Sequence, residues 1–513
     1  MKKIKKICVI LFVAFFLISL KQVAAETYSV TKEADTLDGT CDADCSLREA
    51  IDTSNEREGL DTIQIPSGHY TITIEGVDEQ ENATGDFNVF DDVTIIGSGM
   101  DDTIIDGNYL DRVFDLEDSI FDWSSSQVTI QDLTIQNGEL RIYESNYDYY
   151  LGGGGILSYG AVLEMTNVKL QNNKIYGAEG GGAYLNRDAY LTNCVITGNY
   201  SDSIGGGLYH WDRLNIEGST ITNNTADYNG GGIYFDCEDP ENSCNDWYYL
   251  RIEHSSISHN QSGRDGGGLY AQGEAYIKKT DISDNIAESG GGIYVEIYNN
   301  IMLNKVNMYR NSAEKGGAIY NGNHVQVKKS LLADNNAALK GGGIYNEDTI
   351  FVGNSTLYNN SAVLGGGIYN HSAGQQKILF STIYGNDASN KGGAIYQENK
   401  GVYFQIKNSI IAENNCASEK HKKFIESFGN NISDNDSCYF NHESDHGGIK
   451  KQIVEDTLAD NGGYTFTLAL ASKSPAIDAI EHSSCTDFDN ETVKYDQRRK
   501  RRLKKCDAGA YEK

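Results

Sequence analysis

The sequence predicts an all-β fold, a parallel β-helix in which a single chain winds into a solenoid of stacked coils. A Gly-rich run that ends in Tyr recurs about every 25 residues, and an Asn recurs in phase with it. The 513 residues include 55 Gly but only 3 Pro, whereas average usage would give roughly 36 and 26. Proline removes a hydrogen bond from the ladder of an interior strand, so stacked strands exclude it. A solenoid grows without dividing, so we expect one domain rather than the roughly three or four that length alone predicts.

The Gly-rich motif has the form GG-[GA]-[ILAY]-Y. Consecutive glycines would cost a helix about 1 kcal/mol each, which excludes helical repeats, and the repeats carry too few Leu for leucine-rich coils. One interval between motifs is 36 residues long and contains Cys237 and Cys244, so we expect a loop inserted into an ordinary coil. The other intervals are 24 to 27 residues, and the tyrosines are Tyr184, Tyr209, Tyr234, Tyr270, Tyr294, Tyr320, Tyr345, Tyr369 and Tyr396.

The phased asparagines predict a structural ladder along the solenoid. Stacked coils place equivalent residues about 4.8 Å apart. Asn at a turn tolerates left-handed backbone and can hydrogen-bond to its neighbours above and below. The ladder that we expect consists of Asn173, Asn199, Asn224, Asn260, Asn285, Asn311, Asn335, Asn360, Asn386 and Asn414.

The two ends of the chain differ from the repeats. Four lysines, an apolar stretch of 14 residues from Ile7 to Leu20 and the small residues at 23–25 are typical of a secretory signal, and the stretch is shorter than the roughly 20 residues of a membrane span. Ser46 and Glu49 have the spacing of a helix capping box, so an amphipathic helix is expected to cover the first coil. The parts that we expect are a signal peptide at 1–25, an N-terminal cap at 26–96, the coils at 97–415 and the C-terminal end with its cap at 416–513.

Cysteine usage agrees with export. Eight cysteines fall into close pairs, and spacing alone leaves their connectivity open. The local disulfides that we expect in an oxidising compartment are Cys41–Cys45, Cys237–Cys244, Cys416–Cys438 and Cys485–Cys506. Cys194 has no partner, and no His or Lys lies close in sequence to activate it, so a buried thiol is expected.

The formal net charge of −30 argues against nucleic acid as a partner. No segment after the signal is apolar enough to span a membrane. We expect a monomer that is secreted or displayed at the cell surface, with association to an outer membrane left open. Near the C-terminus, seven of the eight residues from Arg498 to Lys505 are basic. This run predicts an exposed hairpin, an attachment point for anionic envelope polymers or a partner for acidic residues of the same chain.

The two ends also resemble a known family. Cys45-Ser46-Leu47-Arg48-Glu49-Ala50-Ile51 is similar to the signature of the CSLREA domain of secreted bacterial β-helix proteins. Ser474-Pro475-Ala476-Ile477-Asp478, Asp496-Gln497-Arg498 and Cys506-Asp507-Ala508-Gly509-Ala510-Tyr511-Glu512 resemble the C-terminal pattern of choice-of-anchor Q proteins. The Gly-Tyr repeats resemble those of polymorphic outer membrane proteins and pectate-lyase-like helices. The resemblance implies a right-handed β-helix at the bacterial surface or outside it, and implies no established chemistry.

Polar side chains that follow the repeat Tyr in three adjacent coils form the candidate site. Carboxylates one or two coils apart could serve as the acid and base of a hydrolase, and a lyase would need a basic residue as the proton acceptor. The catalytic candidates are Asp188, Asp212, Asp236 and Arg213, and the ligand-binding candidates are Arg187, His210, Trp211 and Trp247. Aromatic faces beside Arg and carboxylates also suit sugar binding without catalysis, and the same residues could merely decorate a solvated turn. Bound Ca²⁺ is a weak alternative, because no calcium-loop pattern is present, so no metal or other cofactor is expected.

The function that we expect is that of a non-enzymatic, adhesin-like scaffold that contacts an extracellular polysaccharide or a cell-surface glycan. The alternative is a polysaccharide lyase or glycoside hydrolase that acts near Arg187 to Trp247. The two hypotheses differ in geometry, because an enzyme needs the carboxylates and Arg213 to converge on one groove.

Overall fold

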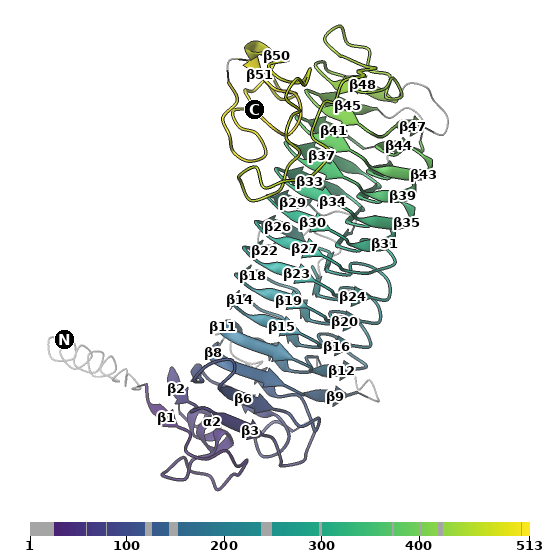
Figure 1. Ribbon diagram of the computed structural model, residues 1–513. Coiled ribbons are helices and arrows are strands. Elements are labelled where there is room, and N and C mark those ends of the chain that lie inside the picture. The colour runs from purple at the N-terminus through teal and green to yellow at the C-terminus, as the bar shows by residue number, and fades with distance from the viewer. Residues whose placement is uncertain are drawn as a thin grey trace, which may run out of the picture.

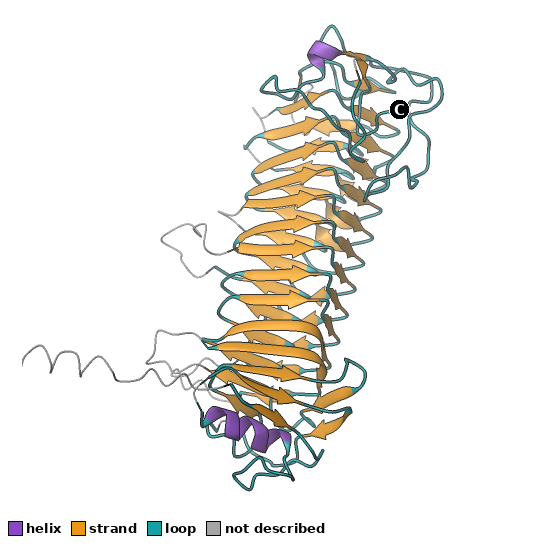
Figure 2. Ribbon diagram, turned by 90° about the vertical axis from the view of Figure 1, so that its left-hand side faces the viewer, coloured by secondary structure: helices purple, strands orange, loops and turns teal. Residues whose placement is uncertain are grey.

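The computed structural model describes residues 25–513, apart from Glu58, Asp78, 118–125, 143–151, 238–248, 297–299, 372–373, 400–402, 419–423 and Lys504. The predicted signal peptide lies outside the described residues, except for its last residue. The chain forms a right-handed parallel β-helix whose coils stack into an elongated column, with a short helix at one end (Figures 1 and 2). This confirms the predicted fold class.

The largest sheet has 27 strands and makes up two adjoining rows of the column. They are β1 (Thr27–Ser29), β2 (Asp61–Gln64), β3 (Gly68–Thr71), β5 (Val93–Ile96), β6 (Thr103–Asp106), β8 (Gln127–Gln136), β11 (Val162–Gln171), β14 (Ala189–Thr192), β15 (Val195–Thr197), β18 (Leu214–Glu217), β19 (Thr220–Thr222), β22 (Tyr249–Glu253), β23 (Ser256–Ser258), β26 (Glu274–Lys278), β27 (Asp281–Ser283), β29 (Asn300–Asn304), β30 (Asn307–Tyr309), β33 (His324–Lys328), β34 (Leu331–Ala333), β37 (Thr349–Gly353), β38 (Thr356–Tyr358), β41 (Gln376–Leu379), β42 (Thr382–Tyr384), β45 (Phe404–Lys407), β46 (Ile410–Ala412), β48 (Ile425–Ser427) and β49 (Ile432–Ser433).

The second sheet has 13 strands and carries the Tyr of each repeat. They are β4 (Phe87–Val89), β7 (Phe114–Glu117), β10 (Ile156–Tyr159), β13 (Ala183–Leu185), β17 (Leu208–His210), β21 (Ile233–Phe235), β25 (Leu269–Ala271), β28 (Ile293–Val295), β32 (Ile319–Asn321), β36 (Ile344–Asn346), β40 (Ile368–Asn370), β44 (Ile395–Gln397) and β47 (Cys416–Ser418).

Short strands close the third side of the coils. The sheet of five strands contains β9 (Glu139–Arg141), β12 (Lys174–Tyr176), β16 (Tyr200–Ser201), β20 (Thr225–Ala226) and β24 (Gln261–Ser262). The sheet of four strands contains β31 (Ser312–Lys315), β35 (Asn336–Lys340), β39 (Ser361–Leu364) and β43 (Asp387–Lys391). An antiparallel pair, β50 (Ile480–Glu481) and β51 (Lys505–Cys506), lies near the C-terminus, and the helices are α2 (Leu47–Asn55) and the 3₁₀ helix His482–Ser484.

The first two glycines of the repeat are needed for two different reasons, as Gly341 and Gly342 show. Gly341 has φ +69°, a left-handed conformation that favours glycine. A Cβ on Gly342 would lie 2.4 Å from the carbonyl oxygen of Ser361 in the next coil, so no side chain fits. The third position is less strict, because Ala318 and Ala394 occupy it in other coils.

The ten phased asparagines form a continuous hydrogen-bonded column. Each Nδ2 donates to the Oδ1 of the next Asn, from Asn173 to Asn414, at 2.8 to 3.1 Å. From Asn173 to Asn386 these side chains are buried. Buried amides must be fully paired, and here the pairing is supplied by the stacking of the coils.

The N-terminal end is covered by α2. The side chain of Ser46 accepts a hydrogen bond from the backbone N–H of Glu49, and Glu49 accepts one from the backbone of Ser46, which is the predicted capping box. The adjoining Arg48 is fully buried, and its guanidinium is paired with Asp35 at 2.7 Å.

Three of the predicted disulfides are present: Cys41–Cys45, Cys416–Cys438 and Cys485–Cys506. Cys244, the predicted partner of Cys237, lies outside the described residues. Cys194 is free and buried, and burial raises the pKa of its thiol to about 11. Its backbone N–H donates to the hydroxyl of Ser219, which occupies the same place in the next coil.

The C-terminal segment (residues 450–513) folds back along the outer face of the largest sheet, where it is drawn in yellow (Figure 1). Gln497 is buried and joins the hydroxyl of Thr356 at 2.8 Å. The hydroxyl of Tyr464 donates to the carbonyl oxygen of Lys279, 185 residues away, at 2.7 Å. The segment therefore covers the flank of the column, whereas residues just before it cover the last coil.

Candidate functional site

Three of the predicted site residues lie together in the turns before β14 and β18. Arg213 Nε donates to Asp188 Oδ1 at 2.9 Å, and Arg213 Nη2 lies 2.6 Å from Asp188 Oδ2. Asp212 accepts a hydrogen bond from the backbone N–H of Arg213, while burial and the neighbouring Asp188 carboxylate raise its pKa. Arg187 is exposed beside them. The Asp188 carboxylate is therefore already paired with a guanidinium.

Asp236 belongs to a different network. Its carboxylate accepts hydrogen bonds from the hydroxyl of Tyr209 at 2.8 Å and from the backbone N–H of Cys237 at 2.7 Å, and burial raises its pKa. Trp211 is half-buried. Trp247 lies outside the described residues. The hydrogen bonds of the four catalytic candidates thus divide them between two networks.

His210 lies in the interior of the column and not on its surface. It is fully buried in the inward-facing row that contains Leu185 and Phe235, and its ring stacks on that of Phe235 with the centroids 6.0 Å apart. Burial lowers the pKa of His210 to about 3. The imidazole is therefore neutral near pH 7, and it is out of reach of an external ligand.

The repeat tyrosines form one continuous stack along the outer face of the 13-stranded sheet. Neighbouring ring centroids are 4.6 to 5.5 Å apart with interplanar angles of 4° to 21°. Tyr270 donates its hydroxyl to Glu296, as Tyr209 does to Asp236. The stack was not predicted, although equivalent aromatic residues at the spacing of one coil have this geometry.

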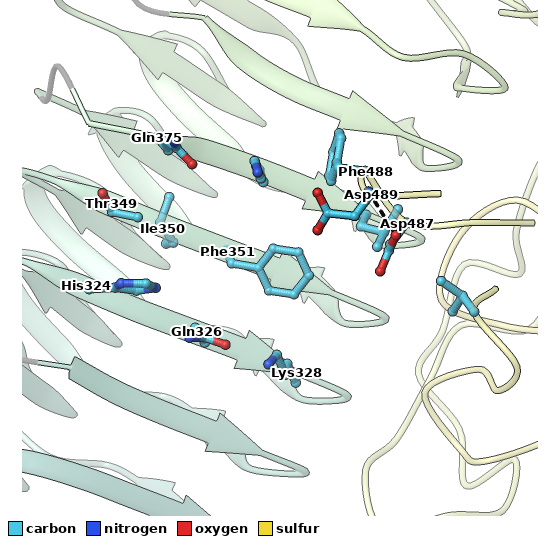
Figure 3. Close-up of a pocket in the computed structure, with 13 residues that line it drawn as sticks. His324, Gln326, Lys328, Thr349, Ile350, Phe351, Gln375, Asp487, Phe488 and Asp489 are labelled. Atoms are coloured by element: carbon cyan, nitrogen blue, oxygen red, sulfur yellow. Dashed lines mark hydrogen bonds between the residues drawn. The ribbon is translucent and has the colours of Figure 1, made fainter. Parts of the chain in front are cut away.

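A lateral groove of about 480 Å³ lies between the outer face of the largest sheet and the C-terminal segment. Because side chains alternate along a strand, buried Val325 and Val327 face the core while their neighbours on β33 face the groove. Figure 3 shows these neighbours, with Phe488 and Asp489 projecting from the C-terminal segment. The sheet contributes His324, Gln326, Lys328, Thr349, Phe351 and Lys377 to the lining.

The lateral groove combines cations with aromatic rings. Lys328 Nζ lies 5.7 Å from the ring centroid of Phe351, and Lys377 Nζ lies 5.5 Å from that of Phe488. Burial and the adjacent Lys329 lower the pKa of Lys328. Ammonium groups at this distance attract the faces of the rings, so both ends of the groove offer a positive charge beside an apolar surface.

The carboxylates of the lateral groove are less available. Asp487 accepts hydrogen bonds from the backbone N–H groups of Asp489 and Glu491, both at 2.9 Å, so it holds the loop in shape. Asp489 is exposed at the rim. Within the described lining, only Asp489 presents a carboxylate that no such loop contact occupies.

A second groove of about 590 Å³ lies beside the first, over the neighbouring row of strands. Its walls include Tyr309, Arg310, Tyr464 and Phe466. Burial, with Asp281 and Tyr309 nearby, raises the pKa of Tyr464 to about 12. The C-terminal segment thus makes grooves on both sides of the line along which it is attached.

Among the described residues, no helix is long and apolar enough to cross a membrane. In the same part of the chain, no group of three or more His, Cys, Asp or Glu side chains is arranged to hold a metal ion.

Comparisons with known proteins match the repeat and the architecture. The model of the Chlamydia polymorphic membrane protein repeat matches residues 218–236. Two solved structures are similar: the A-module of the mannuronan C-5 epimerase AlgE6 of Azotobacter vinelandii (16% identity, 79% of this chain and 99% of that chain, TM-score 0.39) and the pectate lyase Pel9A (12% identity, 96% and 98%, TM-score 0.32). No curated protein sequence matches the chain. The likeness to the two enzymes concerns the β-helix fold alone.

Proposed function

We propose that this protein is a non-catalytic β-helix, secreted or displayed at the cell surface, that contacts an extracellular glycan through the lateral groove. The observation that carries the proposal is the lining of this groove, which two remote parts of the chain build together. The match to a surface-protein repeat and the three disulfides support a location outside the cytoplasm.

The groove offers the chemistry that sugars need. Phe351 and Phe488 supply apolar faces on which a sugar ring can stack. Gln326 and Gln375 line the same groove, and an amide both donates to and accepts from hydroxyl groups. Lys328 adds a donor with a positive charge.

The carboxylates favour binding over hydrolysis. A glycosidase needs two carboxyl groups about 5 to 9.5 Å apart, one on each side of the scissile bond. In the lateral groove, Asp487 is used by backbone N–H groups of its own loop. At the predicted site, Asp188 is paired with Arg213 at 2.6 Å.

The test is to incubate the mature protein with a panel of neutral and acidic polysaccharides while both binding and new chain ends are measured. We expect binding without cleavage, and weaker binding by Phe351→Ala. Tyr190→Ala is the matched control, because Tyr190 is a partly exposed aromatic residue on the same sheet beside the Arg213–Asp188 pair. If only Tyr190→Ala lost binding, the binding site would be assigned to the Arg213–Asp188 pair and not to the lateral groove. If the wild-type protein bound no polysaccharide, the proposal would be refuted.

The second candidate function is that of a polysaccharide lyase with Lys328 as its base. The observation that favours it is the lowered pKa of Lys328, since a base is most effective when its pKa is near the working pH. In the same incubation, unsaturated ends that appear with the wild-type protein and disappear in Lys328→Gln would establish this function instead.

A further inference from the structure

A ridge of basic side chains runs along the column from the lower end of the lateral groove. It lies at the bend between the two strand rows of the largest sheet, one residue per coil. Three bend lysines occupy successive coils: Lys279 after β26, Lys305 after β29 and Lys329 after β33. The backbone N–H of Lys305 donates to the carbonyl oxygen of Lys328, so adjacent bends are joined directly. Successive positions in the ridge are therefore about 4.8 Å apart.

The backbone at this bend does not favour lysine. The bend lysines have φ of 48°, 61° and 52°, in the left-handed region. Other coils place an asparagine there, namely Asn167, Asn193, Asn354 and Asn408, with φ of 48° to 55°. Asn adopts this conformation more readily than a long side chain does. Folding alone would therefore favour Asn at all of these positions.

A fourth cation comes from the C-terminal segment. Residues 495–501 form a hairpin, in which Tyr495 pairs with Arg501 and Arg499 stands at the tip with φ 71°. Gln497 anchors this hairpin to the sheet by donating to the carbonyl oxygen of Ser330 at 3.2 Å. Because Ser330 directly follows Lys329, the anchor brings Arg499 to the upper end of the ridge.

The cations of the ridge repel one another, and within the described ranges no carboxylate forms an ion pair with them. Lys279 Nζ instead lies 3.1 Å from Nε2 of His254, at the bend of the preceding coil. Lys305, Lys329 and Arg499 form no ion pair in the part of the chain that the structure describes. Burial and Arg499 lower the pKa of both Lys305 and Lys329. Asp496 lies near Lys329, but its carboxylate is bonded to Arg498 at 2.7 Å and to the backbone N–H of Glu512. These four cations lie together in a chain with a formal net charge of −30.

We propose that the bend lysines and Arg499 bind one strand of an acidic polysaccharide that lies along the axis of the column. The proposal rests on the proposed glycan contact and names the class of glycan. A straight row of cations at a regular interval matches a linear polymer that carries one negative group per sugar. The row leads to Lys328 in the lateral groove, and partly exposed Tyr464 and Tyr495 offer aromatic faces beside it. Nucleic acid is disfavoured, because the acidic remainder of the surface repels a polymer of such high charge density.

The test uses the mature full-length protein and polygalacturonate, with its neutral methyl ester and duplex DNA as comparison probes. In the ridge variant, Lys279→Asn, Lys305→Asn and Lys329→Asn are combined. Asn is the residue that other coils carry at this bend, so the backbone is preserved. The control variant combines Lys315→Asn, Lys340→Asn and Lys391→Asn, which removes the same charge from β31, β35 and β43 on another face.

We expect the ridge variant to bind polygalacturonate about tenfold more weakly or worse, from the sum of three ion pairs with partly exposed lysines. The control variant should bind within about twofold of wild type, and wild-type binding should weaken with added salt. Unchanged binding by the ridge variant overturns the proposal. Equal wild-type affinity for polygalacturonate and its methyl ester also overturns it but leaves the glycan contact standing, whereas no binding to any polysaccharide refutes both. Tighter binding to DNA, lost in the ridge variant, would assign the ridge to nucleic acid and overturn the proposal.

Discussion

Replacing Asn285 with alanine breaks the asparagine column at its centre and leaves the surface of the protein unchanged. Asn285 is fully buried, and its Oδ1 accepts hydrogen bonds from the backbone N–H of Asn260 at 2.9 Å and from Asn260 Nδ2 at 3.1 Å. Its Nδ2 donates to Asn311 Oδ1 and to the carbonyl oxygen of Ile257, both at 3.0 Å. In Asn285→Ala, the backbone N–H of Asn260 and one N–H of its side-chain amide remain buried without an acceptor. A buried donor without an acceptor costs about 1–3 kcal/mol, so the variant should lose about 2–6 kcal/mol.

Thermal unfolding followed by circular dichroism and amide hydrogen exchange measure this loss. The backbone N–H of Asn260 loses its acceptor, so it should exchange about 30-fold faster if the local loss is about 2 kcal/mol. Asn300→Ala is the control, because Asn300 is exposed and its side chain bonds only to Glu274 among the described residues; its stability should change by less than about 0.5 kcal/mol. The reasoning fails if both variants unfold at the same temperature and Asn260 remains protected.

Three further predictions follow from the buried parts of the molecule. A Cβ on Gly342 or Gly343 would lie 2.4 or 2.6 Å from a carbonyl oxygen of the next coil. Gly342→Ala should destabilise by about 1–3 kcal/mol, whereas Gly343→Ala should cost less because Ala318 and Ala394 occupy this third position in other coils; thermal midpoints test the difference. Burial lowers the pKa of His210 to about 3, so the unfolded chain, with a His pKa of about 6.5, binds more protons between these values. Stability should therefore fall by about 1.4 kcal/mol per pH unit as the pH drops from about 6.5 towards 3, and His210→Leu should lack this part of the acid sensitivity in melting curves. Arg502→Met leaves the Glu512 carboxylate buried without the guanidinium that lies 3.1 Å from it. The free energy that holds the C-terminal segment on the coils should fall by about 3–5 kcal/mol. Limited proteolysis should then cut this segment while the coils stay intact.

The fold could be predicted because a solenoid repeats its requirements. Each coil needs a Gly with left-handed backbone, a second Gly that packs against the next coil, and a buried Asn. The same motif therefore recurs many times in the sequence. The path of the C-terminal segment could not be predicted in this way. Its contacts join Tyr464 to Lys279 and Gln497 to Thr356, which are 185 and 141 residues apart. Each of these contacts is made only once, so it produces no repeating pattern in the sequence.

The candidate site was only partly predictable, and His210 shows why. The sequence places it directly after the repeat Tyr, and neighbouring residues of a strand face opposite sides of the sheet. Since Tyr209 lies in the outer stack, His210 must face the core. The apolar residues at the same position in adjacent coils, Leu185 and Phe235, carried this signal. The lateral groove carried no comparable signal, because one of its walls, with Asp487, Phe488, Asp489 and Val493, comes from the C-terminal segment.

In a repeat protein of this kind, a functional residue is best sought where one coil has a residue that differs from those at the equivalent position of other coils and that makes folding less favourable. The coils can be aligned with one another, and the bend position is Asn in several of them and Gly in another, Gly218. Phe380 departs from this pattern, and the fold explains it, because the guanidinium of Arg502 lies 4.0 Å from the centre of its ring. The three bend lysines also depart from it, in consecutive coils, and each accepts a left-handed backbone that costs about 1 kcal/mol. Among the described residues no carboxylate forms an ion pair with them, and their mutual repulsion opposes folding. An anionic ligand outside the column would turn that repulsion into binding energy, which is why these lysines, rather than the paired Asp188 and Arg213, are the residues to mutate first.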